Sequence, residues 1–337
     1  MIRQKMIMII KEQIRKKLFP GAVIGVTDPE KTLFEESYGT FDGERKTTLD
    51  TIYDLASMTK ITATLPSILL LIQDGLIDPE DPVQRFIAFP DERVRVWHLL
   101  THTSGMPPYS QAYRYKDTRD GILKEIQNEP FRAEPGSSVV YSCLNYILLM
   151  RIVEAITGSF SQFTSERIYN PLGMENTQFA PQNTGNIAPT SIRNDGRLRG
   201  LPDDELAYHL DGISGNAGLF STVPDILKYA RELLYPGKIF SQNILNLSRR
   251  EWTRAIPGDR KGLGWMLWTR RSSGGCLLSE NSFGHTGFTG TSLWIDPEKE
   301  LAIVILTNKC FYSRHQRLEE MWRFRRITHN VILSSIE

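Results

Sequence analysis

Strand-like segments lie at both ends of this 337-residue chain, and helix-like segments fill the middle. Near the N-terminus, residues 22–27 and 32–38 flank a turn at 28–31, which predicts a β-hairpin. The last third of the chain contains three more candidate strands, at residues 264–268, 291–296 and 301–306. No repeat or linker divides the sequence. This pattern predicts an α+β fold in which the two ends form one antiparallel sheet and a mainly helical domain is inserted between them.

Helix-like segments support this division of the chain. An amphipathic helix that lies on the sheet is predicted by the apolar residues Met6, Ile9, Ile10 and Ile14. Further helices are predicted at residues 61–77, with a kink at Pro66, and at 94–100, 144–157, 223–234 and 314–332. The segment 180–212 holds few large apolar side chains and is expected to be irregular. We therefore predict a discontinuous sheet subdomain, residues 1–55 and 250–337, and a helical subdomain, residues 56–249.

Composition and charge argue against several classes of function. The formal net charge is +1 and 23% of the residues are charged, so neither a nucleic-acid footprint nor an acidic tail is expected. The three cysteines, Cys143, Cys276 and Cys310, show no CxxC spacing and are expected to be free thiols in a reducing compartment. The six histidines form no metal-binding pattern. We expect neither a metal nor a cofactor.

The N-terminal apolar run, residues 6–10, is too short for a signal peptide or a membrane span. Charged residues follow it at once, and no small-residue cleavage site appears. We therefore predict a cytoplasmic protein that does not engage a membrane. The sequence leaves the oligomeric state open.

One short motif stands directly before the long apolar helix. In Ser57-Met58-Thr59-Lys60, the lysine follows the serine by three residues, so a helix that begins at Ser57 places both side chains on one face. A serine hydroxyl needs a base to become a nucleophile, and burial lowers the pKa of a lysine. By itself the motif more often describes a capping serine followed by a surface lysine. Its meaning depends on the rest of the chain.

Two further motifs supply that context: Tyr141-Ser142-Cys143 and His285-Thr286-Gly287. In this order and spacing, the three motifs resemble those of the serine penicillin-recognising enzymes, specifically the class C β-lactamases, the D-alanyl-D-alanine carboxypeptidases and their esterase relatives. The resemblance extends from about residue 21 to 308, and includes the segments 99–105, 171–174 and 215–222. It implies a class C β-lactamase-like fold, an antiparallel sheet flanked by N- and C-terminal helices plus an inserted helical domain, with the active site at their junction.

The resemblance also implies a role for each motif. Ser57 would be the acylated nucleophile, Lys60 its base or proton relay, and Tyr141 the second proton carrier toward the leaving group. Which of Lys60 and Tyr141 takes the first proton stays open. The backbone N–H groups of Ser57 and Phe288 would form the oxyanion hole. The substrate would be held by Cys143 and by the third motif, which consists of His285, Thr286 and Gly287.

Two positions depart from the family pattern. Cys143 stands where the family usually has an asparagine, and a thiol is too weak a donor and acceptor to hold both a lysine and a substrate amide. It is either a second nucleophile or a plain buried thiol. His285 replaces the usual lysine, and a histidine near its reference pKa of about 6.5 is mostly neutral at pH 7. Strong selection for a substrate carboxylate is therefore not expected from this position.

These observations favour a cytoplasmic serine hydrolase that forms an acyl-enzyme on an ester, an amide or a cell-wall-derived peptide, with weak β-lactam hydrolysis as a side activity. An acyltransferase on the same site is the first alternative, because the pocket walls choose the acceptor. The second alternative is a penicillin-binding sensor that is acylated slowly and does not turn over.

Overall fold

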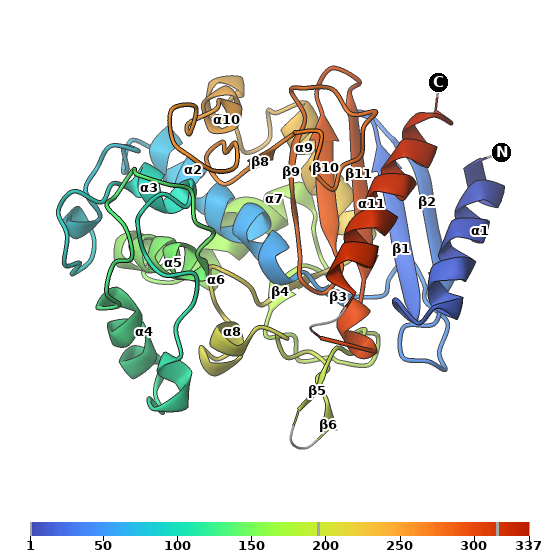
Figure 1. Ribbon diagram of the computed structural model, residues 1–337, viewed down its shortest axis with the longest axis horizontal. Coiled ribbons are helices and arrows are strands. Elements are labelled where there is room, and N and C mark those ends of the chain that lie inside the picture. The colour runs from blue at the N-terminus through green and yellow to red at the C-terminus, as the bar shows by residue number, and fades with distance from the viewer. Residues whose placement is uncertain (1, 194–195, 315–316, 337) are drawn as a thin grey trace.

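The computed structural model describes residues 2–193, 196–314 and 317–336, and its centre is a six-stranded antiparallel sheet (Figure 1). The strand order is β2-β1-β11-β10-β9-β8. The strands are β1 (Gly21–Thr27), β2 (Thr32–Gly39), β8 (Met266–Leu267), β9 (Phe283–Thr286), β10 (Ser292–Asp296) and β11 (Leu301–Thr307). Because β1 pairs with β11, with Val23 opposite Leu306, the two ends of the chain share one sheet. The predicted α+β architecture is confirmed.

One face of the sheet is covered by α1 (Ile2–Arg15) and α11 (Leu318–Leu333), which run side by side across it (Figure 1). Alternate strand residues such as Ile24 and Ile303 pack here against Met6 and Phe324 in one apolar cluster. The predicted amphipathic N-terminal helix is thus confirmed. The C-terminal helix begins at Leu318 instead of residue 314, and residues 315–316 of the predicted span lie outside the described residues.

The opposite face of the sheet packs on α9 (Val223–Leu234). Val23 and Val304 on this face join Ile226 of α9 in a core that continues through the helical part of the molecule. Thr222 caps α9 by accepting a hydrogen bond from the backbone N–H of Asp225 at 3.4 Å. Although α9 belongs to the stretch 56–249, it rests on the sheet. The exact subdomain boundaries stay a prediction.

The helical part surrounds α5 (Cys143–Thr157), in which nine residues are buried. Gly158 ends this helix with a φ of 87°. The other helices of this part are α2 (Leu65–Gln73), α3 (Val96–Leu100), α4 (Arg119–Gln127), α6 (Phe160–Thr164), α7 (Asn170–Leu172), α8 (Glu205–His209) and α10 (Gln242–Arg249). Among the described residues no single helix is long and apolar enough to cross a membrane, and only the bent pair formed by α5 with the segment Phe160–Leu172 passes by length and composition.

The chain around Ser57 departs from the continuous helix that the sequence predicts. A short strand, β3 (Tyr53–Asp54), pairs with β7 (Leu219–Ser221), which also pairs with β4 (Gln178–Phe179). Then come a 3-10 turn (Ala56–Met58), a π-helical turn (Lys60–Thr64) and finally α2. The widened turn lies directly before Pro66, whose ring lacks the N–H that a regular helix needs.

The segment 180–212 is mostly irregular, as predicted, with β5 (Ile192–Arg193), β6 (Gly196–Arg197) and α8 as short exceptions; residues 194–195 lie outside the described residues. The predicted strand at 264–268 begins only at Met266, because Gly264 has a φ of +76°.

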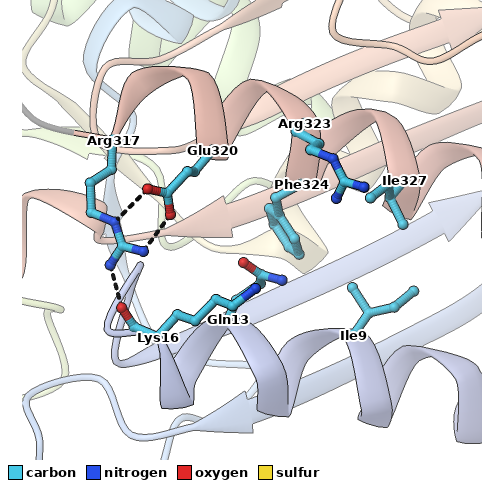
Figure 2. A pocket seen from close by; sticks show the side chains of 8 residues that line it. All are labelled: Ile9, Gln13, Lys16, Arg317, Glu320, Arg323, Phe324 and Ile327. Carbon is cyan, nitrogen blue, oxygen red and sulfur yellow. Dashed lines mark hydrogen bonds and ion pairs between the residues drawn. The ribbon is translucent and has the colours of Figure 1, made fainter.

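A hollow separates α1 and α11 on the outer face of the sheet (Figure 2). Arg317 forms an ion pair with Glu320 at one end of it, and the exposed Arg323 lies farther along α11. Its lining residues are Ile9, Gln13, Lys16, Arg317, Glu320, Arg323, Phe324 and Ile327. None of the residues proposed for catalysis borders this hollow.

Candidate active site

The structure brings together the three side chains that the sequence predicts to be catalytic. Ser57 Oγ accepts a hydrogen bond from Lys60 Nζ at 3.0 Å and another from the Tyr141 hydroxyl at 2.9 Å. Lys60 lies one turn beyond Ser57, whereas Tyr141 is 84 residues away and reaches the site from the chain just before α5. The Ser57 hydroxyl therefore contacts Lys60 and Tyr141, the two groups that can carry its proton.

Lys60 is fully buried and has further acceptors. Its Nζ donates to the backbone oxygen of Asn216 at 2.8 Å and lies 3.8 Å from Cys143 Sγ. Burial by itself lowers the pKa of Lys60, but the neighbouring Cys143 thiol and Tyr141 hydroxyl raise it, and on balance the pKa is raised. The sequence led us to expect a lowered pKa, and that expectation is wrong because it left out these neighbours. Lys60 is an ammonium in the resting site.

The ring of Tyr141 lies near the rings of two histidines, His102 and His285. Its side chain is 40% exposed, yet its hydroxyl lies against Ser57, and burial of that end raises its pKa. The His102 ring lies 4.5 Å from the Tyr141 ring, centroid to centroid, and His102 Nδ1 accepts a hydrogen bond from the N–H of Ser142 at 3.1 Å. Burial lowers the pKa of His102 well below its usual value, so its Nδ1 stays free to accept. His102 thereby fixes the backbone next to Tyr141.

Cys143 is the first residue of α5 and is half-buried. Its backbone N–H donates to the Pro108 oxygen at 2.9 Å, which positions the thiol beside Lys60. Burial raises the pKa of the thiol. A protonated thiol is a poor nucleophile, so the structure argues against the second-nucleophile interpretation.

The third motif lies on β9 and in the turn that follows it. His285 is 3% exposed, and its Nδ1 donates to the Thr286 oxygen at 2.8 Å, since a carbonyl can only accept. Burial, followed by the positive charges of Lys60 and Lys261, lowers the pKa of His285 to about 3. The imidazole is therefore neutral at pH 7, as its substitution for lysine led us to expect.

This turn is docked against the chain that precedes Ser57. Thr291 Oγ1 donates to the Leu55 oxygen at 2.9 Å, and a Cβ on Gly287 would lie 2.4 Å from the same oxygen. Only glycine fits at this approach. On the other side, the Arg325 guanidinium donates to the oxygens of Gly287 and Thr291 at 2.9 Å each.

The nucleophile itself follows a strained residue. Ala56 has a φ of 47°, and its N–H donates to the buried carboxylate of Asp54 at 2.9 Å. Asp54 also accepts from the N–H of Asp203 at 2.8 Å, and burial raises its pKa to about 7. This carboxylate ties the Ser57 turn to the irregular segment that borders the site.

Two hollows meet at Ser57, Tyr141 and Phe288. The first has a volume of about 450 Å³, and its polar walls carry Tyr109, Asp203, Asp204, Glu205 and Arg314. The second has a volume of about 610 Å³ and is bordered by Lys261, Met266, His285, Thr286, Met321, Trp322 and Arg325. Phe288 thus stands beside the nucleophile, where the resemblance places the oxyanion hole, whose assignment stays a prediction. Among the described residues, no group of three or more His, Cys, Asp or Glu is placed to hold a metal ion.

Sequence reasoning missed several residues of the site. Asn216 lies in the glycine-rich segment that carries part of the resemblance, but its contact with Lys60 is made by a backbone oxygen, which leaves no side-chain signature. His102 lies in the segment 99–105, which also belongs to the resemblance, and its position two residues before Ser104-Gly105 was the available signal. For Asp54 and Lys261 the sequence offered no signal.

The family model described as Beta-lactamase matches residues 7–323. A protein of Escherichia coli strain K12, provisionally named a D-alanyl-D-alanine carboxypeptidase, is 33% identical over 341 residues, covering 86% of this chain and 79% of that protein.

Two solved structures share the fold. EstCE1, described as a hydrolase with promiscuous acyltransferase activity, superposes with a TM-score of 0.78 and 21% identity over 98% of each chain. A class C β-lactamase from Rhodobacter sphaeroides gives a TM-score of 0.76 and 18% identity over 98% of this chain and 99% of that one. These similarities confirm the predicted class C β-lactamase-like architecture.

Proposed function

This chain belongs to the beta-lactamase family, and we propose that it is a serine hydrolase that forms an acyl-enzyme on Ser57 and cleaves an ester or an amide. One observation carries the proposal. Ser57 Oγ lies within hydrogen-bond distance of both Lys60 Nζ and the Tyr141 hydroxyl. A nucleophile in contact with two proton carriers is the arrangement that acyl transfer requires.

Because both members of the Lys60–Tyr141 pair carry a proton in the resting site, one of them first gives a proton to water and becomes the base. In the acylation step, Ser57 Oγ then bonds to the substrate carbonyl carbon and its proton passes to that base. The carbonyl oxygen becomes an oxyanion, for which we assign the N–H groups of Ser57 and Phe288 as donors. As the oxyanion collapses, the bond to the leaving group breaks and Tyr141 delivers a proton to the departing oxygen or nitrogen. The ammonium of Lys60 supports this relay, because its charge opposes the rise in the pKa of Tyr141 that burial causes.

In the second step, water attacks the acyl carbon and loses a proton to the same pair. Ser57 then leaves and regains its proton, which restores the resting site. We assign Thr286, Gly287, His285 and Cys143 to substrate binding, because each belongs to a motif beside the nucleophile. Neither Cys143 nor His285 brings a charge to this site.

The substrate class we propose is small esters, amides and cell-wall-derived peptides, with weak β-lactam hydrolysis as a side activity. The carboxypeptidase name of the Escherichia coli relative supports the peptide branch. We retain cytoplasmic localisation, and the absence of nucleic-acid and membrane partners, as predictions.

The experiment that tests the proposal is intact-protein mass spectrometry after incubation with a fluorophosphonate, a penicillin and a p-nitrophenyl ester, with ester turnover followed in parallel. We expect an adduct and turnover in the wild type, and loss of both in Ser57→Ala. Ser334→Ala removes an exposed hydroxyl at the end of α11 and serves as the matched control.

The outcomes separate the alternatives. Full turnover in Ser57→Ala would remove Ser57 from the mechanism. A stable Ser57 adduct without turnover would indicate the sensor, and preferential transfer of the acyl group to an added alcohol or amine would indicate the acyltransferase.

A further inference from the structure

A buried lysine that no motif contains borders the same hollow as Ser57. Lys261 lies between α10 and β8, and its side chain is only 7% exposed. The 610 Å³ hollow that it borders also reaches Tyr141 and His285. A buried ammonium is costly to maintain unless an opposite charge or several acceptors compensate it.

The backbone holds Lys261 firmly in this place. Its N–H donates to Thr253 Oγ1 at 2.9 Å, and its oxygen accepts from the N–H of Trp252 at 2.8 Å. The next residue, Gly262, runs so close to α10 that an added Cβ would lie 2.5 Å from the Ser248 oxygen. The lysine is therefore directed to the hollow by a fixed segment of chain.

The charge of Lys261 is poorly compensated within the described part of the chain. The one ion pair found there joins its Nζ to Asp259 Oδ2 at 3.9 Å, and the Asp259 side chain is 83% exposed. Burial lowers the pKa of Lys261, as expected for an ammonium that lacks a close counter-charge. An anion bound in the hollow would supply that charge.

The other two cations of the hollow are engaged elsewhere. Lys309 Nζ donates to the Arg314 oxygen at 2.9 Å, and Arg325 donates to two oxygens of the third-motif turn. Besides Asp259, Glu319 is the other carboxylate on the rim, and it is exposed. Lys261 is thus the cation with the weakest compensation beside the nucleophile.

We propose that Lys261 is the specificity-determining residue for a substrate carboxylate, supplying the positive charge that the neutral His285 lacks. This inference rests on the proposed function, since it assigns a substrate class to the same site. The hollow also presents the apolar side chains of Met266, Met321 and Trp322. The favoured substrate is therefore an ester or amide that carries a carboxylate next to an apolar group.

The test measures binding separately from turnover. A phenyl ester and the same ester with a carboxylate on the phenol ring are titrated calorimetrically into Ser57→Ala, which leaves both esters intact. We expect Ser57→Ala to prefer the carboxylated ester, and the added Lys261→Met substitution to reduce that preference by about tenfold or more, the effect of one charged hydrogen bond. Lys261→Gln repeats the measurement with a polar side chain, and Lys261→Arg should retain the preference.

The matched control is Arg323→Met, which removes a positive charge from the hollow between α1 and α11 (Figure 2). It should leave the preference unchanged. Equal binding of the two esters when Lys261 is present, or an unchanged preference in both Lys261→Met and Lys261→Gln, would overturn the inference. Loss of preference with Lys261, but no Ser57-dependent hydrolysis in the wild type, would instead overturn the proposed function and leave the carboxylate site standing.

Discussion

Two regions that border Ser57 differ in how completely their charged group is compensated. In the nucleophile region, Lys60 donates to Ser57 and Asn216 at 3.0 and 2.8 Å. In the wall of the larger hollow, Lys261 has a single distant partner at 3.9 Å. Both lysines are almost fully excluded from water. The protein thus fixes the geometry of Lys60 and leaves the charge of Lys261 available for a ligand.

The physical reason lies in the cost of burying charge. A buried ammonium with several acceptors is held in one position, which suits a group that must move a proton over a short distance. A buried ammonium without several acceptors favours binding of an anion, because the anion replaces the favourable interactions with water that burial removed. The first region is therefore specialised for chemistry and the second for recognition.

The largest expected effect comes from breaking the nucleophile region at Tyr141. Tyr141→Phe removes the hydroxyl that lies 2.9 Å from Ser57 Oγ and that we assign to leaving-group protonation. We expect kcat/KM to fall by about 10²-fold or more on an alkyl ester, the usual contribution of a general acid. On a p-nitrophenyl ester the loss should be about tenfold or less, because that leaving group departs without a proton.

The comparison of the two esters carries this prediction, and it is measured by steady-state kinetics on both. Tyr146→Phe is a control for the loss of a buried tyrosine hydroxyl near Lys60, since that hydroxyl donates to the Leu100 oxygen instead of Ser57. Equal losses on the two esters in Tyr141→Phe would contradict a role in protonating the leaving group.

A smaller effect is expected at His285, in the wall region, and it concerns stability. The pKa of His285 is lowered to about 3 in the folded protein, whereas the unfolded chain titrates near the usual value of about 6.5. Between these pH values the unfolded state binds the additional proton, so the free energy of unfolding decreases as the pH falls through this window. His285 therefore contributes stability at neutral pH that is lost on acidification.

Between pH 6.5 and 4.5, we expect the free energy of unfolding to fall by about 2–3 kcal/mol less in His285→Gln than in the wild type. This figure follows from about 1.4 kcal/mol for each pH unit. Urea denaturation at both pH values measures this difference. His209→Gln provides the control, because the His209 ring is exposed at the end of α8. An equal loss in His285→Gln and the wild type would mean that His285 is not kept neutral by burial.

Most of the nucleophile region could be predicted because its residues are close together in the sequence or belong to recognisable motifs. The spacing of Ser57 and Lys60 places them one turn apart in any helical conformation, and the resemblance supplied Tyr141. The strands at the two ends were likewise visible as apolar or alternating runs, and the sheet that joins them follows from antiparallel pairing. These features depend on neighbours in the sequence, or on motifs that recur as a set.

The wall region was not predictable in the same way. Lys261 is one of 40 basic residues, and nothing in its flanking sequence separates it from a surface lysine. Its position is fixed by hydrogen bonds that Trp252 and Thr253, which lie eight or more residues away in the sequence, make with its backbone. The direction of the pKa shift of Lys60 was also not predictable from the sequence, because burial and neighbouring acidic groups shift this pKa in opposite directions.

The smallest expected effect lies at Cys143, which stands between the two regions. Its thiol borders the smaller hollow beside Ser57 and lies 3.8 Å from Lys60 Nζ, a weak contact for both groups. Cys143→Asn would place an amide there, which both donates and accepts and is able to hold a substrate amide against Lys60. We expect the ratio of amide to ester turnover to rise a few-fold, about the effect of one neutral hydrogen bond.

Cys143→Ala is the matched control, because it removes the thiol without adding a donor or an acceptor. The ratio should rise in Cys143→Asn and not in Cys143→Ala, as measured by kcat/KM on an anilide and its ester analogue. A rise in both variants would mean that the thiol merely obstructs the pocket. No change in either would show that substrate amides are held without position 143, which would leave the carboxylate contact of Lys261 as the main determinant of substrate choice.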